Sequence, residues 1–156
     1  MFNILSARDS DLPELDVLMY ELHHEHHLQA PDSFKTAEEI EQEKSIARYL
    51  DDPECLVFVA KKNEKIVGFI TGHFCELVST VSKPIQMGSI DELYVAPEYR
   101  KQRIAQQLYS TLEQRFQEYG VKEVFVEVWH FNQSASQFYT NSGFGHHIHW
   151  LRKVIR

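Results

Sequence analysis

A loop between a predicted strand and a predicted helix carries three cationic side chains, Arg100, Lys101 and Arg103. The strand covers residues 85–95. The helix begins at Ile104, and apolar residues then recur every four positions along one of its faces. The first turn of a helix leaves backbone N–H groups without partners, and the helix dipole makes that end positive. With the three cations, these groups predict a binding site for the phosphates of an anionic cofactor.

The loop is similar to a known motif. Arg100-x-x-Arg103-x-Ala105 resembles the Arg/Gln-x-x-Gly-x-Gly/Ala pyrophosphate loop of the GNAT superfamily of N-acetyltransferases. Arg103 stands where that family usually has glycine, which lets the backbone approach phosphate closely. Because Arg103 keeps its N–H and adds a guanidinium, we expect tuned rather than abolished binding. The resemblance implies that acetyl-CoA is held by Arg100, Lys101, Gln102, Arg103, Ile104 and Ala105.

A second segment resembles the same family. Asn132-x-x-Ala135-x-x-Phe138-Tyr139-x-x-x-Gly143-Phe144 is similar to the segment after the family's fifth strand, which contacts pantetheine and supplies a tyrosine near the thioester sulfur. The resemblance implies that Tyr139 protonates the leaving thiolate and that Asn132 bonds the pantetheine arm. Tyr139 could instead be a packed aromatic beside Phe138, and Asn132 could simply cap the following helix.

Acetyl transfer to an amine also needs a base, and two glutamates are candidates. Glu127 lies twelve residues before Tyr139. This spacing resembles that of protein N-terminal alanine acetyltransferases, where the glutamate is proposed to work with the tyrosine. Glu92 lies on the predicted fourth strand, a frequent location of the family's base, next to the less favoured Asp91. Either glutamate could instead be a salt-bridged or solvent-facing carboxylate, so the choice stays open.

In the family, backbone N–H groups of a bulge in the fourth strand bind the thioester carbonyl and pantetheine. By resemblance, this role falls to Leu93, Tyr94 and Val95. The segment joining the family's first two helices borders the acceptor pocket. The substrate contacts that we expect are therefore Tyr20, Glu21, His24, Phe34 and, on the fifth strand beside Glu127, Trp129.

Histidines crowd the end of the first predicted helix and recur near the C-terminus. They could be solvated, line the acceptor pocket or bind a metal. However, residues 23–27 read HHEHH rather than His-Glu-x-x-His, and no acidic or cysteine partner nearby has metal spacing. No metal site is therefore predicted. Cys55 and Cys75 match no redox or metal spacing, and both are expected to be unpaired.

The predicted elements follow the order βααβββαβαβ, which is α+β in character. The strands are expected at residues 2–8, 55–61, 65–74, 85–95, 121–129 and 144–154, and the helices at residues 12–22, 36–50, 104–119 and 133–141. Capping boxes are predicted at Asp11 with Glu14 and at Thr36 with Glu39. The resemblance implies one GNAT domain over residues 1–156. Its three layers would hold a mixed, mostly antiparallel sheet with splayed fourth and fifth strands and helices on both faces.

The chain has 156 residues and a formal net charge of −7, which argues weakly against nucleic-acid binding and suits a cationic acceptor. No basic start precedes an apolar run, and no segment approaches about 18 consecutive apolar residues, so a cytoplasmic protein without membrane contact is expected.

The resemblance implies an acetyl-CoA-dependent N-acetyltransferase, in which a primary amine attacks directly through a tetrahedral intermediate. A small amine is favoured, because no long docking surface of one charge is visible. The alternatives are a protein N-terminal or lysine acetyltransferase and a non-catalytic acyl-CoA-binding module. Many GNAT proteins of this size are homodimers. The predicted last strand, with Trp150, Leu151 and Val154, could make an isologous contact.

Overall fold

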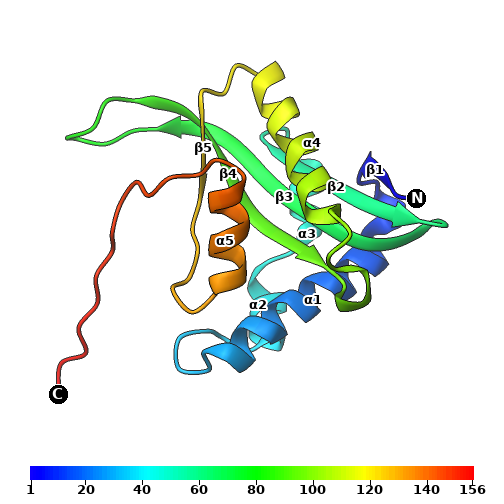
Figure 1. The fold of residues 1–156 in the computed structure, drawn as a ribbon, viewed down its shortest axis with the longest axis horizontal. Helices are drawn as coiled ribbons and strands as arrows, with labels where there is room; N and C mark the ends of the chain where they lie inside the picture. The colour runs from blue at the N-terminus through cyan, green and yellow to red at the C-terminus, as the bar shows by residue number, and fades with distance from the viewer.

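The computed structural model describes residues 1–156 and is organised around one five-stranded sheet (Figure 1). The strands lie in the order β1 (Asn3–Ser6), β2 (Cys55–Lys62), β3 (Lys65–Leu77), β4 (Ile85–Val95) and β5 (Glu123–Val126). Neighbours from β1 to β4 are antiparallel, whereas β4 and β5 are parallel. This mixed, mostly antiparallel sheet confirms the predicted fold class.

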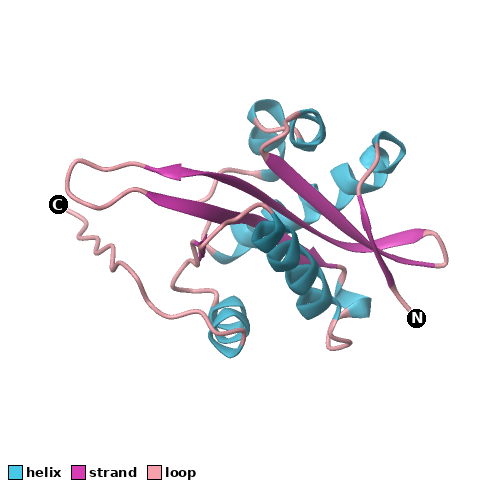
Figure 2. Cartoon of the chain, turned by 90° about the horizontal axis from the view of Figure 1, so that it is seen from above, coloured by secondary structure: helices cyan, strands magenta, loops and turns pink.

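Helices cover both faces of the sheet (Figure 2). The helices are α1 (Leu12–Gln29), α2 (Ala37–Glu43), α3 (Ile46–Asp51), α4 (Ile104–Glu118) and α5 (Gln133–Asn141), with short 3-10 turns η1 (Asp9–Asp11) and η2 (Pro97–Tyr99). Side chains alternate along β2, so that Val57 and Val59 pack with α1 while Phe58 and Ala60 pack with α4. Two apolar cores therefore lie on opposite sides of the sheet. No helix combines the length and the apolar composition needed to cross a membrane.

The step of four along α4 is confirmed, because Ile104, Leu108, Leu112 and Phe116 are all buried. Phe116 lies directly against Gly88 of β4, where an added Cβ would come within 2.7 Å of the ring. Glycine at this position thus lets α4 pack close to the strand. As the crossover between parallel strands, α4 begins at the end of β4 that carries the cationic loop.

An irregularity in β4 opens the sheet. Across β3, Glu92 pairs with Thr71, but the next pair is Ile90 with Gly72, so Asp91 is an extra residue. On the other side, β4 pairs with β5 only as far as Ile90 and then continues alone to Val95. The predicted splaying of the fourth and fifth strands is confirmed. The bulge itself lies at Asp91 rather than within residues 93–95, where the family resemblance had suggested it.

The single helix predicted over residues 36–50 is wrong. The Thr36–Glu39 capping box forms as predicted, but the helix ends at Glu43, and a second one begins at Ile46. Lys44 and Ser45 between them adopt extended backbone. Neither residue is a helix breaker by type, so the interruption comes from tertiary contacts, since Ser45 caps α3 and the Lys44 side chain reaches β4.

Two other predictions at the chain's ends are also wrong. Asp11 and Glu14 form no capping box, because Asp11 pairs with Lys61 at 2.9 Å and Glu14 accepts the Ile66 N–H at 3.0 Å. Residues 144–154 form no strand and run away from the sheet as an extended segment (Figure 1). A strand requires a hydrogen-bonded neighbour, and within the chain this segment finds none.

Candidate active site

A cavity of about 340 Å³ lies where β4 and β5 part. Side chains reach it from α1, the segments flanking α2, β4, the stretch after β5, and α5. The lining residues are Leu22, His23, His26, Phe34, Lys44, Ser89, Ile90, Asp91, Glu92, Leu93, Val126, Glu127, Val128, Trp129, Asn132, Ala135 and Tyr139. The three predicted catalytic residues, Tyr139, Glu127 and Glu92, therefore share one cavity.

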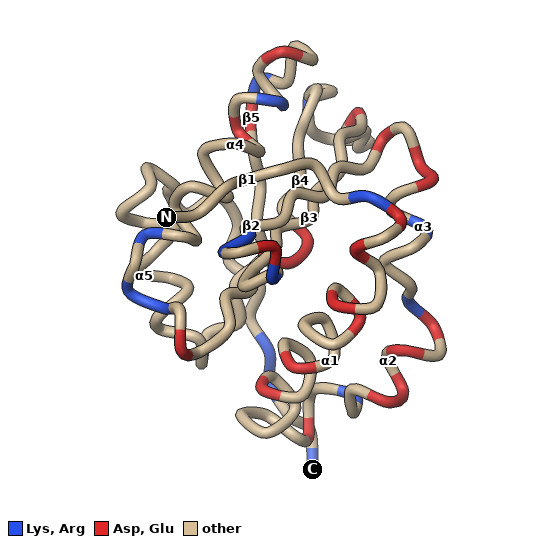
Figure 3. Tube along the Cα trace, turned by 90° about the vertical axis from the view of Figure 1, so that its right-hand side faces the viewer, with Lys and Arg blue, Asp and Glu red and all other residues tan.

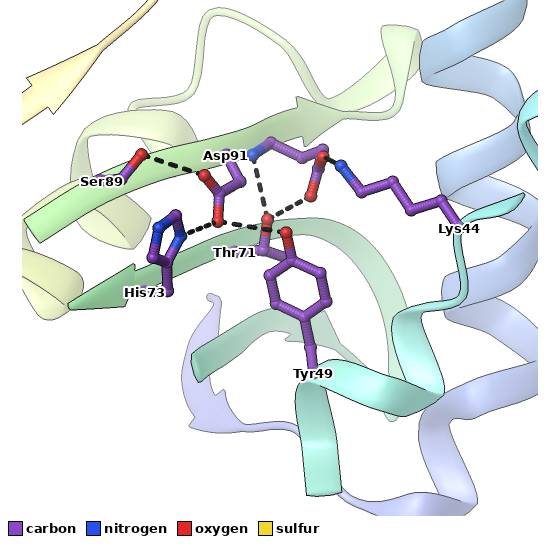
Figure 4. Close-up of polar contacts among 7 residues, drawn as sticks. Lys44, Tyr49, Thr71, His73, Ser89 and Asp91 are labelled. Carbon is purple, nitrogen blue, oxygen red and sulfur yellow. Dashed lines mark hydrogen bonds and ion pairs between the residues drawn. The ribbon is translucent and has the colours of Figure 1, made fainter. Parts of the chain in front are cut away.

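Glu92 is the buried carboxylate of this cavity, with a side chain 4% exposed. One of its oxygens accepts a hydrogen bond from the Thr71 hydroxyl on β3, and the other contacts the Lys44 ammonium (Figure 4). The Thr71 oxygen in turn accepts the backbone N–H of Glu92 at 2.9 Å. These contacts fix the carboxylate at the point where the two strands separate.

The neighbouring Asp91 is the centre of a second polar network (Figure 4). Its carboxylate contacts His73 Nδ1 at 2.7 Å and accepts from Ser89 at 3.0 Å and from the Tyr49 hydroxyl at 3.1 Å. Burial, followed by the charges of Glu92 and Asp91, raises the pKa of Tyr49, so its phenol stays protonated and donates. Asp91 is thereby held by three partners and positioned beside Glu92.

Tyr139 enters the cavity from α5. Its ring packs against Phe138 and Phe144, at centroid distances of 5.1 and 5.3 Å. Burial raises the pKa of the Tyr139 phenol, so the group is protonated at neutral pH and can donate a proton. Asn132 caps the same helix by accepting the Ala135 N–H at 3.1 Å, and it also lines the cavity.

The outer wall of the cavity is aromatic. The rings of Phe34, from the α1–α2 connection, and Trp129 have centroids 4.5 Å apart. The His26 ring stacks on Phe34 with a centroid distance of 5.1 Å. Glu127 is exposed on this wall, one residue beyond the end of β5. The two predicted aromatic contacts, Phe34 and Trp129, thus meet at the mouth of the cavity beside a carboxylate.

Helix α1 turns different residues toward the cavity from those predicted. Leu22, His23 and His26 line it, whereas Tyr20, Glu21 and His24 do not. Tyr20 bonds Glu38, and Glu21 accepts from Tyr94 at 3.2 Å. His24 stacks on Tyr20 outside the cavity.

Sequence reasoning missed Lys44 and Thr71 at this site, and of the histidines at the end of α1, which it left as possible pocket residues, it chose His24 rather than His23 and His26. His26 could have been found, because it extends the buried stripe Leu15, Leu18 and Leu22 by one turn. Burial lowers the pKa of both histidines, that of His23 to about 4 with a further contribution from nearby Lys44. Both imidazoles are therefore neutral at physiological pH. Nothing in the sequence signalled Lys44, because its position depends on the break between α2 and α3.

The free edge of β4 offers backbone donors to the opening. The N–H groups of Glu92 and Ala96 point toward β3, where they bond Thr71 and Val67. Because N–H groups alternate along a strand, those of Leu93 and Val95 point to the opposite side, where β5 no longer pairs. Tyr94, the third predicted donor, points its N–H toward β3.

The loop before α4 is rich in unbonded N–H groups. None of the backbone N–H groups from Lys101 to Gln106 donates to an acceptor within the chain. Lys101 and Arg103 both have a φ of 64°, in the left-handed region, so the position where the resemblance expects glycine does adopt a glycine-like conformation. Free N–H groups at a helix start fit an anion, and this local geometry suits the pyrophosphate of CoA.

Arg100 has a different environment from the rest of the loop. Its Nε donates to the Val95 carbonyl at 2.8 Å, and its guanidinium bonds Glu25 of α1 at 3.2 Å. The guanidinium also lies 5.2 Å from the centre of the Tyr94 ring. Arg100 therefore ties the loop to β4 and α1, whereas Lys101 and Arg103 make no such contacts.

No group of three or more histidine, cysteine, aspartate or glutamate side chains is arranged to hold a metal ion. His146, His147 and His149 lie in the exposed C-terminal segment, where His147 packs 5.2 Å from Phe125. The cysteines Cys55 and Cys75 are unpaired, as predicted.

Comparisons with known proteins agree with this geometry. A sequence model described as the acetyltransferase (GNAT) family matches residues 19–144. A solved acetyltransferase from Vibrio fischeri is 57% identical, over 81% of this chain and 96% of its own, with a TM-score of 0.69. A mutant BH1408 protein from Bacillus halodurans is 19% identical over 99% of both chains, with a TM-score of 0.88. A search of curated proteins found no match.

The aminoglycoside acetyltransferase AAC(6')-Iy, solved with a bisubstrate analogue, is 15% identical over 99% of both chains, with a TM-score of 0.71. At such low identity, this structure and the Bacillus protein show the fold alone. The family match spans most of the chain, and the Vibrio acetyltransferase shares more than half of its aligned residues. The chain therefore belongs to the GNAT family of acetyl-CoA-dependent acetyltransferases.

Proposed function

We propose that this enzyme acetylates a small, cationic primary amine. The observation that carries this proposal is the composition of the cavity between β4 and β5. Three carboxylates line it, Asp91, Glu92 and Glu127, against the single ammonium of Lys44. His23 adds no positive charge, because burial lowers its pKa to about 4. A cavity with this charge balance attracts a protonated amine.

The residues suited to hold acetyl-CoA lie along one side of the opening. The free N–H groups of residues 101–106 would bind the pyrophosphate, and those of Leu93 and Val95 would bind the pantetheine arm and the thioester oxygen. When bound, acetyl-CoA supplies the activated acetyl group. Arg100 would act indirectly by holding the loop against β4 and α1.

We assign the role of base to Glu92 and that of acid to Tyr139. Glu92 is the buried carboxylate at the parting of the strands, and a base in that position can take a proton from the amine directly or through water. Tyr139 is protonated and lines the same cavity, so it can donate to the departing thiolate. Glu127 is exposed at the mouth, where it would attract the cation rather than remove its proton.

The aromatic wall narrows the class of acceptor. The faces of Phe34 and Trp129 can pack on a ring or an alkyl chain, and they attract a cation that passes between them. Acidic residues also gather along α1 and α2 (Figure 3). Amino sugars and polyamines combine these properties. Aminoglycosides, which the structural neighbour AAC(6')-Iy acetylates, are a natural first set to test.

A homodimer is the assembly that we propose. The outer edge of β5 has no neighbouring strand, and the C-terminal segment is extended, unpaired and apolar. Ile148, Trp150 and Val154, which share one side of an extended chain, are 77%, 94% and 67% exposed. Pairing of this segment with the β5 edge of a second copy would satisfy the backbone of both and cover these side chains.

The proposed function is tested by measuring CoA release with a panel of an aminoglycoside, a polyamine, free amino acids and a peptide with a free N-terminus. We expect turnover with the polycations. Glu92→Gln should lower kcat/KM by about 10²- to 10⁴-fold and abolish its rise with pH, because the base is lost. Glu127→Gln should instead raise KM for cationic acceptors while keeping the pH profile. Turnover of the peptide alone would refute the small-amine assignment. If the Glu92→Gln variant kept the wild-type pH dependence of kcat/KM, the assignment of Glu92 as the base would be wrong.

A further inference from the structure

Lys44 brings a primary amine into the active-site cavity from the chain itself. The residue lies in the extended break between α2 and α3, and this backbone path directs its side chain toward β4 (Figure 4). Its ammonium contacts the carboxylate of Glu92 and lies 5.8 Å from the centre of the Tyr49 ring. The Lys44 side chain is 35% exposed, so it is accessible from the cavity.

This arrangement reproduces what an external acceptor requires. An amine that is to be acetylated must give up a proton to a base, and Lys44 already touches the carboxylate to which that role is assigned. The Tyr139 hydroxyl, assigned as the acid, lines the same cavity. A buried carboxylate needs a partner, and the ion pair supplies one.

We propose that the enzyme acetylates its own Lys44 when no external amine occupies the cavity. This inference rests on the proposed function and on its assignment of Glu92 and Tyr139. The Lys44 ammonium gives a proton to Glu92, and its nitrogen lone pair forms a bond to the thioester carbon. The carbon–sulfur bond breaks with its electron pair on sulfur, which takes the Tyr139 proton. The nitrogen then loses a second proton to water, leaving acetyl-lysine and CoA.

Acetylation at this position would change the site in a defined way. The amide of acetyl-lysine is neutral, so the ion pair with Glu92 would be lost. Each chain can react only once, so the reaction should release CoA as a stoichiometric burst rather than as turnover. The modified residue would also stand in the space that an acceptor must enter, which links self-acetylation to a lack of external amine.

Lys35 provides a matched control for uncatalysed acetylation. It flanks the same helix, α2, and pairs with Glu43 at 2.7 Å, but it lies outside the cavity. Its side chain is 53% exposed, against 35% for Lys44. Random chemical acetylation should therefore modify Lys35 at least as readily as Lys44, whereas catalysis within the cavity should favour Lys44.

The experiment is incubation of the purified enzyme with isotopically labelled acetyl-CoA and no amine, followed by peptide mass spectrometry. We expect one added acetyl group, located on Lys44 and present at about 10²-fold or greater excess over Lys35, the lower end of the range for general acid–base catalysis. Lys44→Arg should abolish the modification, and Lys35→Arg should leave it unchanged. Tyr139→Phe should slow labelling of Lys44 without changing that of Lys35.

The outcomes separate this inference from the proposed function. The self-acetylation proposal would be overturned by equal labelling of the two lysines. It would also be overturned if Tyr139→Phe left the rate of Lys44 labelling unchanged. If external amines are acetylated in the parallel assay while Lys44 stays unmodified, the inference is wrong and the proposed function stands. If neither Lys44 nor any amine is acetylated although the chain binds CoA, both are wrong.

Discussion

Thr71 and Glu92 hold each other through two hydrogen bonds across the β3–β4 bulge. The Thr71 hydroxyl donates to the Glu92 carboxylate, and the same oxygen accepts the Glu92 backbone N–H at 2.9 Å. Thr71 is completely buried, which is unusual for a polar side chain. One hydroxyl therefore fixes both the backbone and the carboxylate of the proposed base at the point where Asp91 interrupts the pairing.

Thr71→Val should destabilise the protein and impair catalysis. Valine has nearly the same shape, so the change removes the hydroxyl and leaves the Glu92 N–H without its partner. Leaving such a buried donor unsatisfied costs about 1–3 kcal/mol, which urea unfolding would measure. Thr71→Ser, which keeps the hydroxyl, is the control and should retain most of the kcat. If the valine variant were as stable as the wild type, the two hydrogen bonds between Thr71 and Glu92 would not contribute the expected stability.

Tyr139→Phe should lower kcat by about 10²-fold while CoA affinity is kept, because a proton donor is lost but the packed ring remains. The pH dependence has a defined sign. Burial raises the pKa of Tyr139 above the ordinary tyrosine value of about 10, so the acid form persists as pH rises. Loss of this acid should therefore cause no fall in wild-type kcat below about pH 10. Steady-state kinetics and CoA calorimetry check both statements.

Two substitutions test the loop before α4. One should raise the stability of the fold, and the other should weaken CoA binding. Arg103→Gly should raise the free energy of unfolding by about 1 kcal/mol, because Arg103 has a φ of 64° and glycine adopts that region without strain. Ala105→Glu should weaken CoA binding, because a carboxylate beside the free N–H groups repels phosphate. Unchanged CoA affinity in a folded Ala105→Glu variant would show that this loop does not bind the pyrophosphate of CoA.

His23 should make the folded state sensitive to acid. Its pKa is lowered by burial from 6.5 to about 4, so between these values the unfolded chain binds more protons than the folded one. The contribution to stability is full above pH 6.5 and is lost as pH falls toward 4. Allowing for its partial exposure, we expect a loss of about 1–2 kcal/mol across that window.

The comparison of wild type with His23→Gln isolates this effect, since glutamine does not titrate. The variant should lose less stability than the wild type between pH 6.5 and 4. His24→Gln, one position along on the outer side of α1, is the matched control and should behave like the wild type. If the two variants show the same pH dependence, His23 is not the group responsible.

The C-terminal segment predicts a concentration-dependent dimer. Sedimentation at micromolar concentration should show a mass twice the 18.3 kDa of one chain. Removing residues 146–156 should give a folded monomer, because the exposed apolar side chains and the free backbone of the segment are gone. Trp150→Ser should weaken the association without changing the fold. A wild-type chain that sediments as a monomer would refute the proposal.

The sequence by itself determined the elements whose signals are local. The bounds of β4 and α5 were predicted to the residue, and the start of α4 at Ile104 followed from its step of four. Gly120 and Gly143, which follow α4 and α5 by two residues, have φ values of 81° and 100°, a backbone region that glycine adopts without strain. Such features depend on neighbouring residues, on periodicity and on backbone freedom, which a sequence displays directly.

Only the tertiary structure decided which side chains meet. Lys44 reaches Glu92 because α2 stops short, and His23 rather than His24 lines the cavity because the packing of α1 sets its rotation. Residues 144–154 were predicted as a strand, yet no strand formed, because a strand exists only with a hydrogen-bonded neighbour. Contacts between distant segments depend on where whole elements dock. No local pattern encodes that docking, and the bulge at Asp91, which opens the site, is set by it.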